Sequence, residues 1–261
     1  MFTLNNLTKK NDLRKQKLNI LNEKIKNRNE KIKKHNEKIK NNNEKIKKYS
    51  LEFFDKLSHL QNNLKLDFGT FMDEYPEQMM AVRYLKGDEK VLELGGNIGR
   101  NSLIIASILN NNNLVSMECD EEISRQLLHN KNKNNLNFFI ENSALSKRKL
   151  IQKGWDTIVS NELLKGYKKV KTIDYENLKE KYKIDFDTLV IDCEGAFYYI
   201  LMDMPELLNG IKLIIMENDY HDESHKKYVD NILTEKGFTL DYVESGGWGP
   251  CYNNFFEVWK K

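Results

Sequence analysis

Apolar and polar positions follow two different patterns along this chain, and the change falls near residue 64. In the first part, apolar residues recur every seven positions. The clearest units are Asn-Glu-Lys-Ile repeats that end at Ile25, Ile32, Ile39 and Ile46. No Pro or Gly precedes Gly69, so nothing in this stretch breaks a helix. A sustained heptad of this kind predicts a long coiled-coil helix over residues 1–63.

The predicted seam of that helix is only half apolar. With isoleucine at position a of the heptad, position d holds Arg28, His35, Asn42 and Tyr49. Such a stripe buries too little surface to hold a lone helix, so we expect self-association as a homodimer or homotrimer through residues 1–63. Isoleucine at a favours the dimer, whereas polar residues at d weaken that preference.

From residue 64 the pattern changes to short apolar runs separated by amphipathic stretches. The runs predict strands at 91–94, 114–117, 136–140, 188–191 and 213–216, with helices at 102–109, 121–129, 196–202 and 224–236. Residues 238–243 and 255–259 predict a closing antiparallel hairpin. This alternation predicts an α/β domain over 64–261, with a Rossmann-like, seven-stranded sheet covered by helices on both faces.

Charge and cysteine usage narrow the class of protein further. Residues 1–60 hold 17 Lys/Arg against 7 Asp/Glu, and the remainder holds 25 against 32. The basic excess fits either an anionic partner or plain solvation of a coiled coil, and we favour solvation. The three cysteines form no CxxC pair, which argues against a disulfide framework or a zinc site. No signal peptide or 18-residue apolar run occurs, so we expect a soluble cytoplasmic protein without a membrane partner.

The candidate chemistry begins at the segment Val91-Leu-Glu-Leu-Gly-Gly-Asn-Ile-Gly99, an apolar strand followed by a glycine turn. Glycines let the backbone approach a ligand closely. A dinucleotide site spaces its glycines GxGxxG and keeps the preceding strand apolar, whereas here Glu93 precedes Gly95, Gly96 and Gly99. An acid at that place suits a cationic ligand without phosphate. The segment therefore favours S-adenosylmethionine, which carries a sulfonium and an amino group.

Two further segments complete the predicted cofactor site. Glu118 ends the next strand, where an acid can accept hydrogen bonds from both ribose hydroxyls. At the third strand, Ser143 and Ala144 are small residues suited to hold the adenine edge. An exposed strand-end carboxylate is the alternative explanation for Glu118, and an ordinary polar loop is the alternative for the third segment.

With these residues in view, residues 64–261 resemble the FkbM family of class I methyltransferases. The matching segments are 91–99, Glu118, 142–145, 170–174 and 187–195, the last containing Ile191-Asp-Cys-Glu-Gly195. Val190 departs from the family pattern, which commonly has Lys there, and Gly96 stands where Ala is common. The resemblance implies an O-methyltransferase acting on a hydroxyl of a sugar, glycan or related small molecule. Carried over by position, the cofactor residues are Glu93, Gly95, Gly96, Asn97, Gly99, Glu118, Ser143 and Ala144.

Methyl transfer to an alcohol also needs a base or a metal ion, because an alcohol is a weak nucleophile near neutral pH. Asp192 ends the fourth core strand, and Glu217, Asn218 and His221 follow the next one. Carboxylate and amide oxygens suit Mg²⁺, which gives Asp192, Glu217 and Asn218 as candidate metal ligands. The alternative is metal-free base catalysis, so that Asp192, Glu217 and His221 are the candidate catalytic residues; strand-end capping is a third explanation.

Two other functions fit parts of the sequence. One is an RNA methyltransferase tethered by the basic N-terminal helix, although the acidic remainder of the chain argues against a nucleic-acid partner. The other is a coiled-coil scaffold with an inactive methyltransferase fold. The intact glycine loop and the two acids at Glu93 and Glu118 argue against the scaffold.

Overall fold

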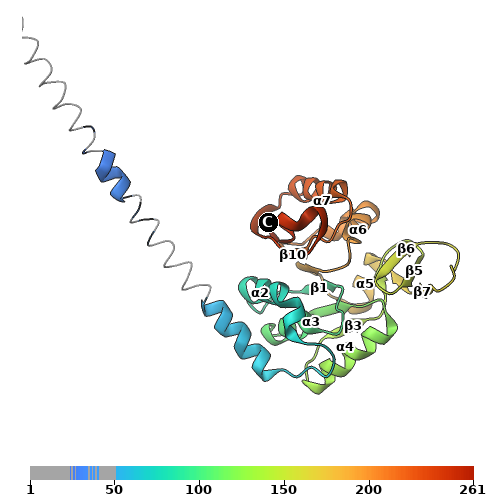
Figure 1. Ribbon diagram of the computed structural model, residues 1–261. Helices are drawn as coiled ribbons and strands as arrows, with labels where there is room; N and C mark the ends of the chain where they lie inside the picture. The colour runs from blue at the N-terminus through green and yellow to red at the C-terminus, as the bar shows by residue number, and fades with distance from the viewer. Residues whose placement is uncertain are drawn as a thin grey trace, which may run out of the picture. The chain divides into compact units, whose positions relative to one another are not determined.

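A computed structural model describes residues 24, 26, 28–34, 36, 38, 40 and 51–261 (Figure 1). The chain divides into two compact units, Met1–Glu52 and Phe53–Lys261. The described residues of the first unit are helical and exposed. The seam positions Ile25, His35, Ile39, Asn42, Ile46 and Tyr49 lie outside the described residues. The coiled coil and the self-association that it implies therefore stay predictions.

The second unit is built around one seven-stranded sheet. Its strands are β1 (Val91–Leu94), β2 (Leu114–Met117), β3 (Phe139–Glu141), β9 (Thr188–Ile191), β10 (Leu213–Glu217), β11 (Thr239–Glu244) and β12 (Phe256–Lys260). Their order is β11-β12-β10-β9-β1-β2-β3. Neighbours pair in parallel except at β12, which runs antiparallel to both β10 and β11. The predicted Rossmann-like sheet with a C-terminal antiparallel hairpin is confirmed.

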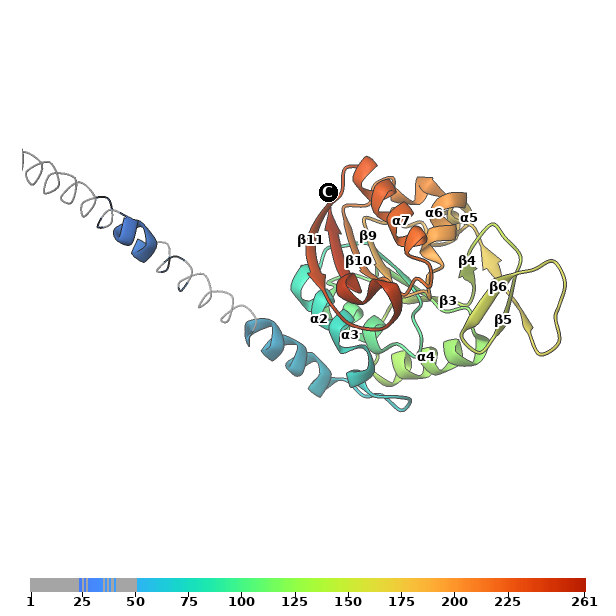
Figure 2. The ribbon, with the colours of Figure 1, turned by 45° about the horizontal axis from the view of Figure 1, so that its top comes forward.

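Helices cover both faces of this sheet (Figures 1 and 2). One face carries α2 (Tyr75–Tyr84), α3 (Arg100–Ile108) and α4 (Glu121–Lys133), and the other carries α5 (Tyr175–Tyr182), α6 (Phe197–Asp203) and α7 (Glu223–Glu235). Short 3-10 helices lie at η1 (Phe71–Glu74), η2 (Pro205–Leu208) and η3 (Gly249–Asn254). Because helices cover both faces, every residue of β1, β2 and β9 is buried.

The last turns of the predicted coiled coil belong to this second unit. Residues 51–63 are helical, and Leu57 is fully buried against Val82 and Ile104. Phe53 and Leu60, which continue the seven-residue spacing, pack against the same cluster. The division between the two compact units falls after Glu52, because these apolar residues contact the domain itself.

Between β3 and α5 the chain forms two small sheets that the sequence patterns did not indicate. One pairs β4 (Ala144–Leu145) with β8 (Thr172–Ile173). The other is antiparallel and contains β5 (Leu150–Lys153), β6 (Asp156–Val159) and β7 (Lys168–Val170). Within the described part of the chain, no helix combines the length and apolar composition that a membrane span requires.

Candidate active site

The glycine segment forms the turn between β1 and α3, at the point where the strand order reverses. In open α/β sheets, ligands bind in the crevice beside that reversal. Gly95 has φ +91°, and a Cβ added there would lie 1.5 Å from the backbone oxygen of Asp192, on the neighbouring strand end. Gly99 also has a positive φ, of +97°. Glycine is required at Gly95 because two strand ends approach each other there without room for a side chain.

Gly96 and Asn97 complete this turn. The N–H groups of Gly95 and Gly96 both donate to the carbonyl oxygen of Met117, which ties the turn to the end of β2. A Cβ at Gly96 would lie 2.1 Å from Ser116 Oγ, so alanine could not enter without a shift of that hydroxyl. Asn97 adopts φ +45°, a left-handed conformation that asparagine tolerates better than most residues.

Glu118 lies beside this turn, as its place at the end of β2 predicted. Its Oε2 accepts a hydrogen bond from the Asn97 N–H at 3.0 Å, and its Oε1 accepts one from the Asp120 N–H at 2.7 Å. The side chain is buried, and that burial raises its pKa. Two backbone donors hold the carboxylate in one orientation at the crevice, which a merely exposed strand-end acid would not have.

The predicted role of Glu93 in lining the cofactor stays a prediction, and its described contacts are with the protein itself. Glu93 is 2% exposed and lies beneath the turn, where its Oε2 accepts a 2.5 Å hydrogen bond from Ser102 Oγ on α3. Ser102 in turn contacts Ser116 Oγ at 3.0 Å. Burial raises the pKa of Glu93 to about 7. The observed contacts of this acid fix α3 and β2 behind the glycine turn.

The third predicted segment also reaches the crevice. Asn142 Nδ2 donates to the carbonyl oxygen of Glu118 at 2.9 Å, so the loop after β3 is bonded to the loop after β2. Ser143 is buried, and its hydroxyl donates to Glu141 Oε1 at 3.0 Å. Ala144 is half-buried on β4. These contacts bring the segment next to Glu118 and leave the role of Ser143 and Ala144 toward adenine a prediction.

Across the crevice, three carboxyl groups converge. Asp192 ends β9, Glu217 ends β10 and Glu77 comes from α2; their oxygens all lie within 4.8 Å of one another. Burial and the neighbouring acids raise the pKa of Asp192, and burial together with Glu77 raises the pKa of Glu217. Glu77 Oε2 is buried without a hydrogen-bond partner among the described residues. The group therefore requires protons or a cation to balance its charge.

The other predicted catalytic and metal residues lie around this cluster. Asn218 is fully buried; its Nδ2 donates to the Asn254 carbonyl oxygen at 2.7 Å, and its Oδ1 has no described partner. His221 is exposed, and its ring centroid lies 4.5 Å from that of Trp248. The structure thus brings Asp192 and Glu217 together with Glu77, whereas His221 lies at an aromatic rim.

Sequence reasoning missed three acids of this site. Glu74 accepts hydrogen bonds from Arg100 Nη1 at 2.8 Å and from Asn97 Nδ2 at 3.2 Å, and burial raises its pKa to about 7. Asp219 accepts one from the Gly195 N–H at 2.6 Å, and burial raises its pKa to about 7. Glu77 is the third. Glu74 and Glu77 lie outside every strand-end motif, and only the acids on either side of Pro76 hinted at a helix start.

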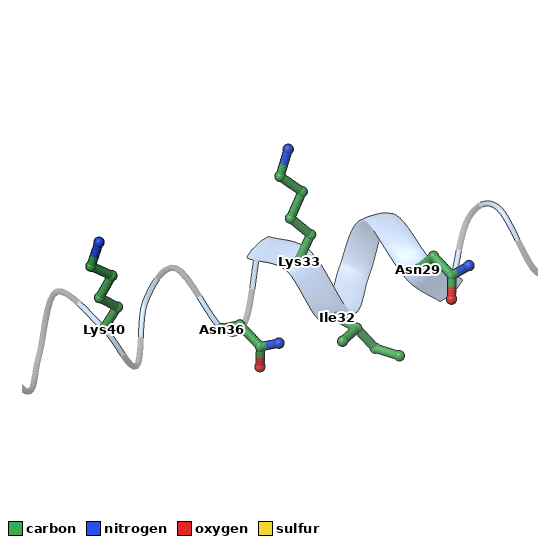
Figure 3. A pocket seen from close by; sticks show the side chains of 5 residues that line it. All are labelled: Asn29, Ile32, Lys33, Asn36 and Lys40. Carbon is green, nitrogen blue, oxygen red and sulfur yellow. The ribbon is translucent and has the colours of Figure 1, made fainter.

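A shallow surface pocket elsewhere does not compete with this site. The five side chains of Figure 3 all come from one helical stretch of the first unit: Asn29, Ile32, Lys33, Asn36 and Lys40. Figure 3 shows Ile32 and Asn36 on one side of that stretch and Lys33 and Lys40 on the other. A single helix encloses no ligand, so this stretch carries no functional assignment.

Comparison with known proteins gives similarity of fold only. No protein-family model matches the sequence, and no curated protein is similar to it. Among solved structures, a putative O-methyltransferase from Klebsiella pneumoniae is 14% identical, with a TM-score of 0.45 over 78% of this chain and 88% of that chain. An O-methyltransferase from Bacillus cereus in complex with SAH is 15% identical, with a TM-score of 0.45 over 81% of this chain and 90% of that chain.

A further similar structure is a protein of the NADB-Rossmann superfamily from Streptococcus agalactiae. It is 12% identical, with a TM-score of 0.46 over 70% of this chain and 67% of that chain. TM-scores below 0.5 at such identities carry no argument about activity. The assignment of function therefore rests on the residues of the crevice.

Proposed function

We propose that this chain is an S-adenosylmethionine-dependent methyltransferase. The observation that carries the proposal is the position of Glu118, whose carboxylate is held by the Asn97 N–H beside a glycine turn at the reversal of strand order. A carboxylate at this place suits the two ribose hydroxyls of an adenosyl ligand. Each Glu118 oxygen accepts one backbone N–H and retains a further lone pair for a ribose hydroxyl.

The charge around the turn supports a sulfonium ligand over a dinucleotide. Glu74 and Glu118 both accept hydrogen bonds from Asn97, which belongs to the turn. Within the described part of the chain, Arg100 is the basic side chain bonded to the acids beside the turn. Its guanidinium group already forms ion pairs with Asp73 and Glu74. A pyrophosphate would meet uncompensated negative charge here, whereas a sulfonium and an ammonium group would be attracted.

We further propose that the methyl group goes to a hydroxyl oxygen, in the manner that the FkbM resemblance implies. The transfer is an in-line displacement: the acceptor oxygen attacks the methyl carbon, the carbon–sulfur bond breaks, and the hydroxyl proton leaves to a base. Asp192 and Glu217 lie across the crevice from the proposed ribose contact, where an acceptor would approach. An ionised Asp192 or Glu217, or a neutral His221, would take the proton, and their placement orients the acceptor.

Mg²⁺ is a second way to activate the acceptor, and the residues present fit it. Glu77, Asp192 and Glu217 offer oxygen ligands from three elements, and the unpartnered Glu77 oxygen would gain a partner. The predicted third ligand, Asn218, would offer its Oδ1, which has no described partner, while its Nδ2 donates to the Asn254 carbonyl oxygen. A bound Mg²⁺ would polarise the acceptor hydroxyl and lower its pKa. Without it, the crowded carboxyls hold protons, and one of them must lose its proton before it can act as the base.

A sugar or glycan is the acceptor that the rim of the site fits. Trp248 is exposed beside His221, at the end of the sheet where Asp192 and Glu217 lie. An exposed indole face offers an apolar platform for the C–H face of a sugar ring, and neighbouring carboxylates accept hydrogen bonds from sugar hydroxyls. Self-association through residues 1–63 is part of the same proposal and would present several such sites together.

The acceptor assignment is tested by incubating the full chain with methyl-labelled S-adenosylmethionine and a panel of sugar nucleotides and glycans, with and without Mg²⁺. We expect label on a sugar hydroxyl, lost in Asp192→Asn and retained in Glu235→Gln, a matched change on the exposed end of α7. Label only on RNA would contradict the sugar acceptor while leaving the methyl donor intact. Absence of binding of the donor would contradict the methyltransferase itself.

A further inference from the structure

The small antiparallel sheet of β5, β6 and β7 stands out from the edge of the domain in both ribbon views (Figures 1 and 2). Residues 147–171, here called the arm, contain this sheet and its loops. The arm holds eight Lys/Arg against two Asp/Glu, a net charge of +6. The rest of residues 61–261 has a net charge of −13. A basic segment in an acidic domain is a local feature that the proposed chemistry does not use.

The arm also exposes large apolar side chains. Trp155 is 63% exposed, Leu163 55% and Leu164 45%, and Val159 is exposed as well. Single exposed apolar residues are ordinary on a protein surface. Four within 25 residues, on one projecting element, are a concentration of exposed apolar surface, a feature that marks interaction sites.

Two contacts place Trp155, Leu163 and Leu164 at one end of the arm, whereas Val159 pairs with Leu150 at the other end of the hairpin. Trp155 lies in the two-residue turn of the β5–β6 hairpin, where Lys153 pairs with Asp156. Tyr167 Oη donates to Asp156 Oδ2 at 2.7 Å, and the Tyr167 N–H donates to the Leu164 carbonyl oxygen at 3.1 Å. The loop bearing Leu163 and Leu164 is thus fastened to the Trp155 end of the hairpin.

Lysines flank these apolar residues. Lys153 comes directly before the hairpin turn, and Lys165 directly after Leu164. A Cβ added at Gly166 would lie 3.7 Å from Lys153 Cε, so the hairpin lysine reaches the loop. Neither Lys153 nor Lys165 has an ion-pair partner among the described residues, unlike Lys168, which pairs with Asp120 near the proposed cofactor site. The unpaired lysines surround an apolar tip.

We propose that the arm docks this protein on the surface of an anionic lipid bilayer. Tryptophan prefers the headgroup region, leucine is stabilised at the acyl boundary, and lysine is attracted to anionic lipids. A nucleic acid would also attract the lysines and stack on Trp155, but it offers nothing apolar to bury Leu163 and Leu164. The aliphatic residues therefore decide between the two partners.

This proposal differs from the sequence-based expectation of no membrane partner. That expectation addressed spanning segments, and a peripheral contact needs none. The docking is independent of the proposed methyl transfer. It would place the crevice close to acceptors carried on a membrane, since Lys168 of the arm bonds Asp120, two residues beyond Glu118.

The test is co-sedimentation of the full chain with large vesicles of phosphatidylcholine, with and without about 30% phosphatidylglycerol. We expect binding to the anionic vesicles, weakened by salt, and loss of about 90% of it in the Trp155→Ser, Leu163→Ser, Leu164→Ser variant. In Lys153→Gln, Lys165→Gln the affinity should fall about thirtyfold, from roughly 1 kcal/mol for each lysine. Circular dichroism of each variant checks that the domain is folded.

The basic N-terminal region supplies the control, because it could bind vesicles by itself. Lys33→Gln, Lys34→Gln removes the same charge from exposed helical positions there and should leave most of the binding. The proposal is overturned if the arm variants bind as the unchanged chain does, if the N-terminal variant alone loses binding, or if no anionic vesicle binds. Stronger binding of a labelled RNA than of vesicles, lost in the arm variants, would also overturn it in favour of a nucleic-acid partner.

Discussion

The two sides of the crevice satisfy their polar groups in opposite ways. On the side of β1 and β2, Glu118 accepts two backbone N–H groups and Glu93 accepts a serine hydroxyl. On the side of β9 and β10, Glu77, Asp192 and Glu217 crowd together, and one Glu77 oxygen has no described partner. A site whose groups are already oriented binds its ligand with little rearrangement, whereas crowded acids require a proton, a cation or a ligand. The first side suits a fixed cofactor and the second a reacting partner.

We expect the largest effect on stability from a substitution that forces apart the ends of β1 and β9. In Gly95→Ala, the added Cβ would meet the Asp192 backbone oxygen at 1.5 Å, and the residue has a strained φ. We expect the free energy of unfolding to fall by about 3 kcal/mol or more, measured by urea denaturation. Gly154→Ala is the control, since it has a φ of +59° but meets nothing within 4 Å. An equal loss in both variants would contradict the close approach of the strand ends.

The next effect concerns pH. Burial raises the pKa of Glu74 and Glu93 to about 7, from 4.5 for the ordinary group. The folded chain therefore retains protons that the unfolded chain loses, and the free energy of unfolding should fall as pH rises from 4.5 to 7. In Glu93→Gln, the decrease in the free energy of unfolding between pH 4.5 and 7 should be smaller by about 2–3 kcal/mol, as measured by urea denaturation at each pH. An unchanged pH profile in this variant would contradict the burial of a titrating Glu93.

A smaller effect isolates the ribose contact. Glu118→Ala removes the acceptor proposed for the ribose hydroxyls, and we expect the affinity for S-adenosylhomocysteine to fall about 10- to 100-fold, equivalent to roughly 1.5–3 kcal/mol. Calorimetric titration measures it, with Glu235→Ala as the matched control on an exposed helix end. Because Glu118 also accepts the Asn97 N–H, the melting temperature of the variant must be followed alongside. Equal affinities of the two variants for S-adenosylhomocysteine would contradict the assignment of Glu118 to the cofactor site.

We expect the smallest effect from a substitution that tests the contact with the sugar acceptor. Trp248→Ala should raise KM for a sugar acceptor about five- to tenfold, from roughly 1 kcal/mol of lost stacking, and leave the affinity for S-adenosylhomocysteine unchanged. Tyr252→Ala, an exposed aromatic residue on the neighbouring η3, serves as the control. Steady-state kinetics at saturating donor separates the two parameters. A loss of affinity for S-adenosylhomocysteine, with KM for the sugar unchanged, would contradict the assignment of Trp248 to the acceptor site.

The sequence predicts those parts of the molecule that depend on the spacing of apolar residues or on a residue's place at the end of a strand. The strands at 91–94, 114–117 and 188–191 coincide with β1, β2 and β9, because fully buried strands are continuous apolar runs. The position of Glu118 beside the turn followed from its place after β2. The arm escaped prediction because its strands are short and interrupted by lysines. Glu77 escaped because its helix joins the crevice through tertiary packing, which no local pattern encodes.

The contacts of Glu93 teach a related lesson. Its place before the glycines predicts a contact with the cofactor, which stays a prediction, and the structure adds that the side chain accepts a hydrogen bond from Ser102 on α3. The serine at that helix position was the signal, since a buried acid needs a donor nearby. Sequence spacing located the residue, and only packing revealed what it touches.

The most direct test of the central claim is a calorimetric titration of the full chain with S-adenosylhomocysteine and, separately, with NAD⁺. We expect saturable binding of S-adenosylhomocysteine at one site per chain and no measurable binding of NAD⁺, because acids surround the glycine turn. Binding of NAD⁺ in preference to S-adenosylhomocysteine, or no heat with either ligand, would contradict the assignment of this crevice to a methyl donor.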